Sequence, residues 1–356
     1  MAEPRKNEPK IEADEVLAGI VEWVSIESPS HDAKSVNKVV DHVEKQFTDL
    51  GLKLDRTPGV DGFGDILECK TTPAMSQQAD GKGILVLAHL DTVHPIGMIE
   101  KDLKVRREGD SIFGPGIYDM KAGGYIAYYA LRHLIRQGKK TKLPVTFLFI
   151  PEEEVGSPTS RARIEQAARG HKYALVMEPG RDGDRVVTSR KGVGRFTLTV
   201  KGAASHAGVR HEDGRSAIHE MARQIMRIEA KTDYARGITC NVGLIQGGTG
   251  VSVVPAECKI EVDLRVPSQQ LAEEMTHWFL NLEPIGKDVT LTVEGEMNRP
   301  PYQKDAGITA LFEKAKSIYA EIGKELKDVP LTGGGSDGNF TAALGIPTLD
   351  GLGADG

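Results

Sequence analysis

GILVLAHLD, residues 83–91, is an unbroken apolar run that ends in a histidine and an aspartate. Such a run predicts a strand buried on both faces, as in a parallel sheet. Two similar runs follow, LPVTFLFIPEEE (143–154) and YALVMEP (173–179), and a helical pattern spans 121–138 between the first two. Strands alternating with helices predict an α/β domain with a mostly parallel sheet between layers of helices, an α/β/α arrangement.

Near residue 193 the sequence changes from continuous apolar runs to an alternation of apolar and polar residues. VGRFTLTVKG (193–202) alternates between apolar and polar residues, which is typical of a half-exposed antiparallel strand. The patterns that follow give the order β-α-β-β-α-β of a ferredoxin-like α+β domain. From about 303 an amphipathic helical pattern returns. The sequence therefore predicts one larger domain in two parts, 1–192 and 303–356, with a smaller domain inserted at 193–302.

Composition and charge exclude several classes of protein. The net charge of −6 comes from 51 acidic and 45 basic residues mixed along the chain, so we expect no nucleic-acid partner. No apolar stretch is long enough to span a membrane and the N-terminus lacks a secretory signal, so we expect no membrane association and a cytoplasmic protein. Three widely spaced cysteines, Cys69, Cys240 and Cys258, are expected to be reduced and buried.

Each of the three buried strands ends in residue types that bind metals or carry protons. They are His89 and Asp91, then Glu152, Glu153 and Glu154, then Glu178. Another carboxylate, Asp119, lies in the loop GPGIYDMKAG (114–123). Ligands of parallel sheets gather at the carboxyl ends of the strands. The sequence therefore predicts one carboxylate-lined pocket at that edge.

The residue types in this pocket indicate a metal centre. The candidate ligands are His89, Asp119, Glu154 and Glu178. Imidazole and carboxylate without thiolate suit Zn²⁺, or Mn²⁺ or Co²⁺ with less preference. Asp91 points to the same side of an extended chain as His89 and can accept its N–H. Metal-assisted hydrolysis needs one carboxylate to hold the metal and another, here Glu153, to take a proton from the attacking water. The alternative for the two glutamates is a solvated helix N-terminus.

The motifs HLDTV, GPGIYDMKAG, PEEEVGS, MEP and GAASHAG resemble, in order, those of the di-zinc aminoacylase and glutamate carboxypeptidase family. That family includes acetylornithine deacetylase and succinyl-diaminopimelate desuccinylase, and the similarity runs from about residue 12 to the last residue. The glutamate carboxypeptidases are the most similar members. The resemblance implies a zinc-dependent hydrolase that cleaves an amide or peptide C–N bond of a small carboxylated substrate. An N-acyl amino acid or a dipeptide-like substrate with a C-terminal glutamate is the expected type.

Residue by residue, the resemblance implies two zinc ions in a complete chain. The ligands of one ion would be His89, Asp119 and Glu178. The other ion would be bound by Glu154 and by Asp119, which bridges the two ions. Asp91 would be the partner of His89, and Glu153 the general base and later the acid that protonates the leaving amine. The family often has a cis peptide after the bridging aspartate, so we expect one between Asp119 and Met120.

For the inserted domain, the resemblance implies a dimerisation domain and a homodimer. His206, in SHAG, would reach the partner subunit's site and polarise the scissile carbonyl. Asn241, Arg265 and Arg299 match positions that help to bind substrate carboxylates, and an arginine fork suits a carboxylate. The alternatives are a helix cap for His206 and an ordinary surface ion pair for Arg265.

One family ligand is missing from this sequence. The second zinc of the family also needs a histidine near the C-terminus, whereas this sequence has none beyond His277 and ends at Gly356. We expect a truncation short of that ligand and of the closing strand and helix; the alternative is natural loss of one metal, with Asp350 or Asp355 as a replacement. We expect such a chain to bind at most one zinc firmly and to be nearly inactive.

Two other functions stay open at this point. One is a hydrolase of the same family that acts on another C–N bond, such as that of an aromatic amine or a carbamoyl group. The other is a binding protein that keeps the fold without turnover. The missing histidine favours the second alternative, and the presence of Glu153 argues against it.

Overall fold

The computed structural model describes residues 11–356 apart from 79–80, 182 and 184. The chain forms two compact units. The first runs up to Thr188 and resumes over Lys304–Pro330 and Ser336–Gly356, and the second comprises Ser189–Gln303 and Leu331–Gly335. The second unit therefore interrupts the first in the sequence.

The first unit contains a six-stranded sheet in the order β1-β2-β6-β3-β7-β14. The strands are β1 (Lys53–Thr57), β2 (Ile66–Lys70), β3 (Gly83–His89), β6 (Val145–Ile150), β7 (His171–Val176) and β14 (Thr348–Leu349). β3 pairs in parallel with β6 and β7, and β7 pairs in parallel with β14. β1 and β2 add an antiparallel edge. These pairings confirm the predicted mostly parallel sheet.

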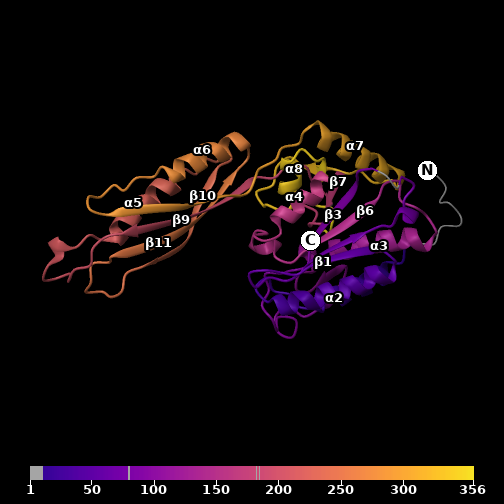
Figure 1. Cartoon of the computed structure of the whole chain (residues 1–356), viewed down its shortest axis with the longest axis horizontal. Coiled ribbons are helices and arrows are strands. Elements are labelled where there is room, and N and C mark those ends of the chain that lie inside the picture. The colour runs from indigo at the N-terminus through magenta and orange to yellow at the C-terminus, as the bar shows by residue number, and fades with distance from the viewer. Residues whose placement is uncertain (1–10, 79–80, 182, 184) are drawn as a thin grey trace. The chain divides into compact units, whose positions relative to one another are not determined.

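Helices cover both faces of this sheet (Figure 1). The helices of the unit are α1 (Ala13–Val24), α2 (Ala33–Asp49), α3 (Ala122–Arg136), α4 (Arg161–Arg169), α7 (Ala306–Glu321) and α8 (Gly338–Ala343). Successive side chains of a strand point to opposite faces. Val86 of β3 accordingly lies in a core with residues of α1, α2 and α3, and Leu87 lies in a core with residues of α4 and α8. The run at 83–88 has apolar residues at successive positions because helices cover both faces of β3.

Local sequence signals explain where α2 begins and ends. The Asp32 carboxylate accepts the backbone N–H of Ser35 at 3.1 Å, which caps the first turn. One face of the helix is buried, and it includes Val36, Val39, Val40, Val43 and Phe47. Gly51 follows the helix with a φ of 79°, a conformation that glycine adopts at little steric cost.

The second unit has an antiparallel sheet in the order β10-β11-β9-β12. Its strands are β9 (Gly192–Lys201), β10 (Thr239–Gly247), β11 (Glu257–Val266) and β12 (Thr290–Arg299), and its helices are α5 (Ala217–Glu229) and α6 (Gln269–Leu280). The sequence order β-α-β-β-α-β and this strand order are those of the predicted ferredoxin-like fold. Alternate strand residues, such as Phe196 and Ile260, form a core with the two helices.

Short elements complete the described chain. They are β4 (Arg106–Glu108), β5 (Ser111–Phe113), β8 (Val186–Val187), β13 (Asp328–Val329), η1 (Pro73–Met75), η2 (Ile117–Lys121), η3 (Glu153–Val155) and η4 (His211–Asp213). Across the described residues, no helix combines the length and the apolar character that a membrane crossing needs.

Candidate metal centre and active site

The predicted pocket residues come from four segments of the first unit. His89 is the last residue of β3, Glu178 follows β7 by two residues, and Glu153 and Glu154 begin η3 after β6. Asp119 lies in η2, just before α3. Parallel pairing brings the ends of β3, β6 and β7 to one edge of the sheet, which is the reason these distant residues meet.

The surroundings of His89 fix its ring. The buried imidazole has its Nδ1 2.9 Å from the backbone carbonyl oxygen of Asp91. A carbonyl oxygen only accepts, so Nδ1 carries the hydrogen. Nε2 then faces two carboxylates, with Asp119 Oδ1 at 3.0 Å and Glu178 Oε1 at 3.8 Å.

This arrangement is suited to a cation. Burial lowers the pKa of His89, but hydrogen bonds to Asp119 and Asp91 outweigh burial and raise that pKa well above its ordinary value of 6.5. Nε2 can face these carboxylates only with a positive charge between them or on the ring. A divalent metal ion would supply that charge and take the Nε2 lone pair.

Two overlapping groups of side chains bring their ligand atoms within 4.8 Å of one another. One group is His89, Asp119 and Glu154, and the other is His89, Glu153 and Glu178. The donor set fits a divalent metal such as zinc, because it offers imidazole and carboxylate and no thiolate. The grouping differs from the predicted division of ligands, since Glu153 also offers an oxygen at ligand distance.

The two adjacent glutamates lie in different environments. Burial raises the pKa of Glu154 to about 7, the carboxylates of Asp119 and Glu153 add to the rise, and His89 opposes it. A bound cation would reverse this effect by favouring the charged carboxylate. Without a cation the Glu154 carboxyl is therefore readily protonated, and a bound metal ion would keep it charged as a ligand.

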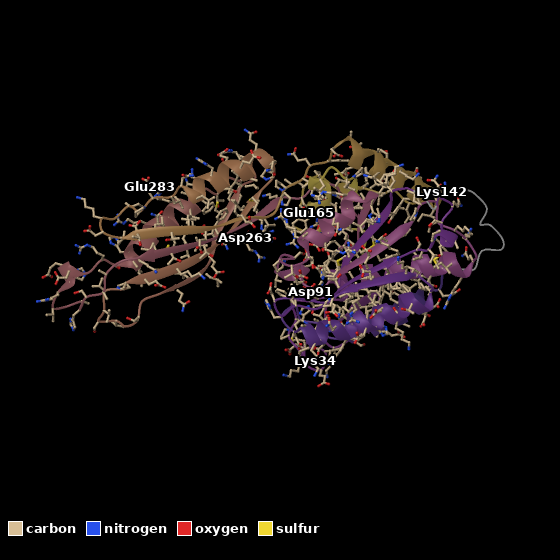
Figure 2. The ribbon with its side chains drawn as sticks, in the orientation of Figure 1. Lys34, Asp91, Lys142, Glu165, Asp263 and Glu283 are labelled. Carbon is tan, nitrogen blue, oxygen red and sulfur yellow. The ribbon has the colours of Figure 1, made fainter. Side chains whose placement is uncertain are left out.

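Asp91, which is labelled in Figure 2, is buried in the first unit, and its carboxylate has closer partners than the predicted one, His89. Its carboxylate Oδ1 is 3.4 Å from His89 Nδ1, which is farther than its own backbone oxygen. The carboxylate instead accepts the backbone N–H groups of Glu153 at 3.0 Å and Glu154 at 3.1 Å. It also accepts the hydroxyl of Ser30 at 2.6 Å.

The loop that carries Asp119 depends on a glycine. Gly116 has a φ of 67°, and a Cβ at this position would lie 2.3 Å from Cγ2 of Thr92. The peptide bond between Asp119 and Met120 is cis, as the resemblance implied. The Met120 sulfur accepts the backbone N–H of His89 at 3.3 Å, which joins this loop to the end of β3.

One predicted pocket residue lies elsewhere. The Glu152 carboxylate turns to the start of α4, where it accepts the backbone N–H groups of Thr159 at 3.1 Å and Ser160 at 2.8 Å. It also accepts both of their hydroxyls. Glu152 therefore holds the chain after η3 and does not line the metal centre. The hydroxyl residues of SPTS, which follow PEEEVG, were a signal for these bonds.

Sequence reasoning missed two buried residues at the site, Ser30 and Lys121. The Lys121 ammonium donates to the Ile26 carbonyl at 2.5 Å. Burial lowers the pKa of Lys121 to about 7, and the charges of Asp91 and Glu27 oppose that shift. Lys121 is part of the motif that carries Asp119, and a lysine in an otherwise apolar helix start was the available signal.

The predicted substrate-binding residues lie in the second unit. The Arg265 guanidinium donates to both carboxylate oxygens of Asp263, at 2.7 and 2.9 Å, and to the Gly333 carbonyl at 3.3 Å. This is the ion pair that the alternative interpretation predicted. Arg299 is buried at the end of β12, and Asn241 is exposed on β10.

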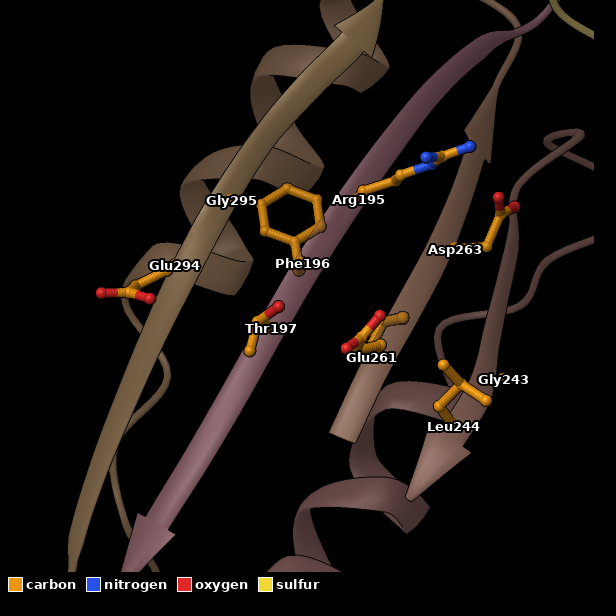
Figure 3. A pocket seen from close by; sticks show the side chains of 10 residues that line it. Arg195, Phe196, Thr197, Gly243, Leu244, Glu261, Asp263, Glu294 and Gly295 are labelled. Atoms are coloured by element: carbon orange, nitrogen blue, oxygen red, sulfur yellow. The ribbon is translucent and has the colours of Figure 1, made fainter. Parts of the chain in front are cut away.

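His206 is exposed and does not cap a helix. Its Nδ1 accepts the backbone N–H of Gly208 at 3.1 Å, whereas α5 is capped by Ser216. A separate hollow of about 370 Å³ lies on the sheet of this unit, where Arg195 and Asp263 project from neighbouring strands (Figure 3). Its lining includes no residue predicted for metal binding or catalysis.

A histidine and carboxylate cluster at the carboxyl edge of a mostly parallel sheet can hold the divalent metal of a hydrolase. The chain belongs to Peptidase family M20/M25/M40, whose family model matches residues 85–356. This membership establishes a hydrolytic enzyme of amide or peptide bonds that depends on a divalent metal.

Several relatives match most of the chain. Carboxypeptidase G2 from a Pseudomonas species is 28% identical over 348 residues, which cover 96% of this chain and 82% of the relative. Succinyl-diaminopimelate desuccinylase from Acidovorax ebreus is 27% identical over 331 residues, with 86% and 82% covered. The structure of aminopeptidase PepT from Bacillus cereus shares the fold with a TM-score of 0.74 at 24% identity, covering 95% of this chain and 90% of that one.

Proposed function

We propose that this protein is a zinc-dependent hydrolase that cleaves an amide or peptide C–N bond of a small carboxylated substrate. An N-acyl amino acid or a peptide with a C-terminal glutamate is the proposed type. The observation that carries the proposal is His89, whose Nδ1 is committed to a carbonyl while Nε2 faces two carboxylates. Similarity to a carboxypeptidase and a desuccinylase supports the substrate class.

The proposed metal ligands are His89, Asp119, Glu154 and Glu178. When bound, zinc would polarise the scissile carbonyl and make the attacking water more acidic. Glu153 takes a proton from that water as the water oxygen bonds to the carbonyl carbon. The same carboxyl then gives the proton to the amine nitrogen as the C–N bond breaks. Asp91 holds the turn that carries Glu153 through two backbone N–H groups.

The second unit is proposed to bind the substrate carboxylates and to form a homodimer. Asn241, Arg265 and Arg299 are the proposed carboxylate-binding residues, and Arg265 would exchange its present partner Asp263 for the substrate. His206 is proposed to polarise the scissile carbonyl in the partner subunit's site. β10 is an edge strand of its sheet and supports this dimer, because such strands offer unpaired backbone groups.

We also propose a cytoplasmic location. Cys69, Cys240 and Cys258 are all free thiols and all buried. Burial raises the pKa of each of these thiols, so they resist oxidation and stay in the thiol form. Free cysteines of this kind are typical of a reducing compartment.

The test is a hydrolysis screen of the zinc-loaded protein. The panel contains N-acyl amino acids, peptides with a C-terminal glutamate, N-carbamoyl amino acids and aromatic amides. Turnover of the first two classes, abolished by a chelator and restored by zinc, is the expected result. Exclusive turnover of the last two classes would show a hydrolase of carbamoyl or aromatic amine C–N bonds instead. Zinc binding without any turnover would favour a binding protein.

A further inference from the structure

The buried carboxylate of Asp91 serves the turn after β6 more closely than it serves the imidazole. Its Oδ1 accepts the N–H of Glu153 at 3.0 Å, and its Oδ2 accepts the N–H of Glu154 at 3.1 Å. The hydroxyl of Ser30 donates to the same Oδ2 at 2.6 Å. His89 Nδ1 has the Asp91 backbone oxygen as its nearer acceptor, at 2.9 Å, whereas the carboxylate Oδ1 lies at 3.4 Å.

Ser30 is itself fixed in place. It ends a strap, residues 26–30, that lies in the connection between α1 and α2 and pairs with the chain that follows β3. Within the strap, the Ser28 hydroxyl donates to the Leu90 carbonyl at 2.6 Å, and the Ser28 carbonyl accepts the N–H of Thr92 at 2.8 Å. The N–H of Ser30 donates to the Thr92 carbonyl at 3.3 Å. The Ser30 hydroxyl therefore reaches Asp91 from a backbone that is bonded to Thr92 at both Ser28 and Ser30.

The other end of the strap is also anchored. Lys121 donates to the Ile26 carbonyl at 2.5 Å. The Glu27 carboxylate accepts the N–H groups of Gly97 at 2.8 Å and Ile99 at 3.0 Å. The strap is therefore a fixed frame that connects the Asp119 loop, the chain after β3 and the Asp91 carboxylate.

The turn that carries Glu153 has little structure of its own. η3 is a three-residue 3-10 turn, and the first N–H groups of a helix have their partners outside it. The Asp91 carboxylate accepts the N–H groups of Glu153 and Glu154, so its orientation helps to set the backbone position of Glu153. The bonds of the Glu152 carboxylate to the start of α4 also hold this turn. A displacement of about 1 Å in a catalytic group is enough to slow a reaction strongly.

We propose that Ser30 is a positioning residue for hydrolysis: through the Asp91 carboxylate it holds the turn that presents Glu153. The inference rests on the proposed function, in which Glu153 is the base. Without the Ser30 hydroxyl, a buried carboxylate oxygen loses its shortest hydrogen bond and the carboxylate gains freedom to rotate. The two N–H bonds to the turn then weaken together.

The test compares Ser30→Ala with Ser317→Ala, a matched loss of a hydroxyl that donates to the Lys314 carbonyl at 2.7 Å on α7. Amide exchange of Glu153 and Glu154, zinc affinity and steady-state kinetics are measured on both variants. In Ser30→Ala we expect the two amides to exchange at least about tenfold faster, as the loss of one hydrogen bond to a charged group predicts. We expect kcat to fall about tenfold with KM unchanged, and zinc affinity to stay within about twofold.

Two results would overturn the inference. Weaker zinc binding with unchanged exchange of the two amides would show that the Asp91 carboxylate acts on His89. An equal rise in exchange throughout the first unit would show a merely structural role for Ser30.

A second pair of variants separates this inference from the proposed function. In a Glu153→Gln background, Ser30→Ala should slow the residual turnover no further, because the group that it positions is gone. A full additional loss in that background would overturn the inference alone. A wild-type rate in Glu153→Gln would contradict the proposed base, and the inference with it.

Discussion

Glu153 and Glu154 are neighbours in the chain to which we assign different tasks. A glutamine at position 153 keeps the size of the side chain and its backbone bond to Asp91, but it cannot take a proton from water. We expect Glu153→Gln to keep zinc binding and to lower kcat by about 10²–10⁴-fold, the usual contribution of a general base. Zinc titration and single-turnover kinetics measure the two effects.

Glu154→Gln is the matched control for that variant. It should lose zinc affinity first and activity as a consequence, because Glu154 is the proposed ligand. If Glu153→Gln turned over substrate at the wild-type rate, the base would have to be another residue.

His171 gives a pH-dependent stability that is independent of the metal centre. Burial lowers its pKa, and its ring contacts the Ala167 carbonyl at 2.6 Å and the Thr146 hydroxyl at 2.8 Å. The neutral ring is therefore preferred in the folded state, while the unfolded chain binds a proton near the ordinary pKa of 6.5. The contribution of His171 to stability should be complete above pH 6.5 and should be lost as the pH falls from 6.5 through the lowered pKa of the folded state.

The measurement is urea unfolding of the wild type and His171→Asn between about pH 5 and pH 8, the range in which histidine titrates. Other titrating groups are common to both proteins and cancel in the difference. The stability advantage of the wild type should shrink towards the acidic end. A difference that stays constant with pH would show that His171 does not titrate differently in the two states.

At the residue scale, the sequence predicted the pocket because each strand end carries its own polar residue. His89, Glu154 and Glu178 could be found in this way, since a parallel sheet brings its strand ends together. Ser30 could not, because its contact with Asp91 joins residues 61 positions apart and depends on how the strap pairs with the chain after β3. Glu152 has the same residue type as its neighbours, and only its bonds to Thr159 and Ser160 reveal its different task.

At the element scale, the loop that carries Asp119 depends on Gly116. Gly116→Ala would meet both a left-handed backbone and the 2.3 Å approach to Thr92. Gly138 lies just after α3 with a φ of 65°, and nothing lies within 4 Å of an added Cβ. Gly138→Ala would therefore be strained by the left-handed backbone alone. We expect Gly138→Ala to lower the free energy of unfolding by about 1 kcal/mol and Gly116→Ala by about 3 kcal/mol.

Denaturant unfolding compares the two variants, and zinc titration shows whether the loop still presents Asp119. Gly116→Ala should also bind zinc more weakly, whereas Gly138→Ala should bind it as the wild type does. Equal stability losses in both variants would show that the close approach to Thr92 is relieved at little cost.

The types and order of the elements followed from periodicity, but their ends did not. The helical pattern at 121–138 corresponds to α3 at Ala122–Arg136, and the alternating pattern of VTLTVEGE (289–296) continues in the structure as β12 to Arg299. The start of α3 is set by the turn around Asp119, and the last residues of β12 are set by pairing with β9. Both depend on neighbours that are distant in the sequence.

At the scale of the whole molecule, the division into two units was visible as a change from buried strands to alternating ones. The assignment of Leu331–Gly335 to the second unit was not, because this segment lies beyond the resumption of the first unit. It joins the second unit through backbone bonds to Ser189 and Lys191 and through the Arg190 guanidinium, which donates to the Gly334 carbonyl at 3.0 Å. No local pattern in a glycine-rich segment predicts such partners.

The proposed homodimer predicts a defined response to charge on β10. Leu244 on this edge strand is 63% exposed. We expect Leu244→Lys to convert a dimer into a monomer in sedimentation at micromolar concentration, because a lysine on an edge strand opposes pairing with a second chain. Thr292→Lys on β12, the opposite edge strand, is the control and should stay dimeric. A wild-type protein that sediments as a monomer would contradict the dimer and the proposed action of His206 in the partner subunit.

The metal centre is tested by titrating zinc into metal-free wild type, His89→Gln and His219→Gln. His89 is the buried residue common to both ligand groups, whereas His219 is exposed on α5. Calorimetry should show tight zinc binding to the wild type and to His219→Gln. Binding to His89→Gln should be weaker by at least about 100-fold, more than the loss of a ligand's partner produces. Zinc binding by His89→Gln with the wild-type affinity would contradict the metal centre proposed here.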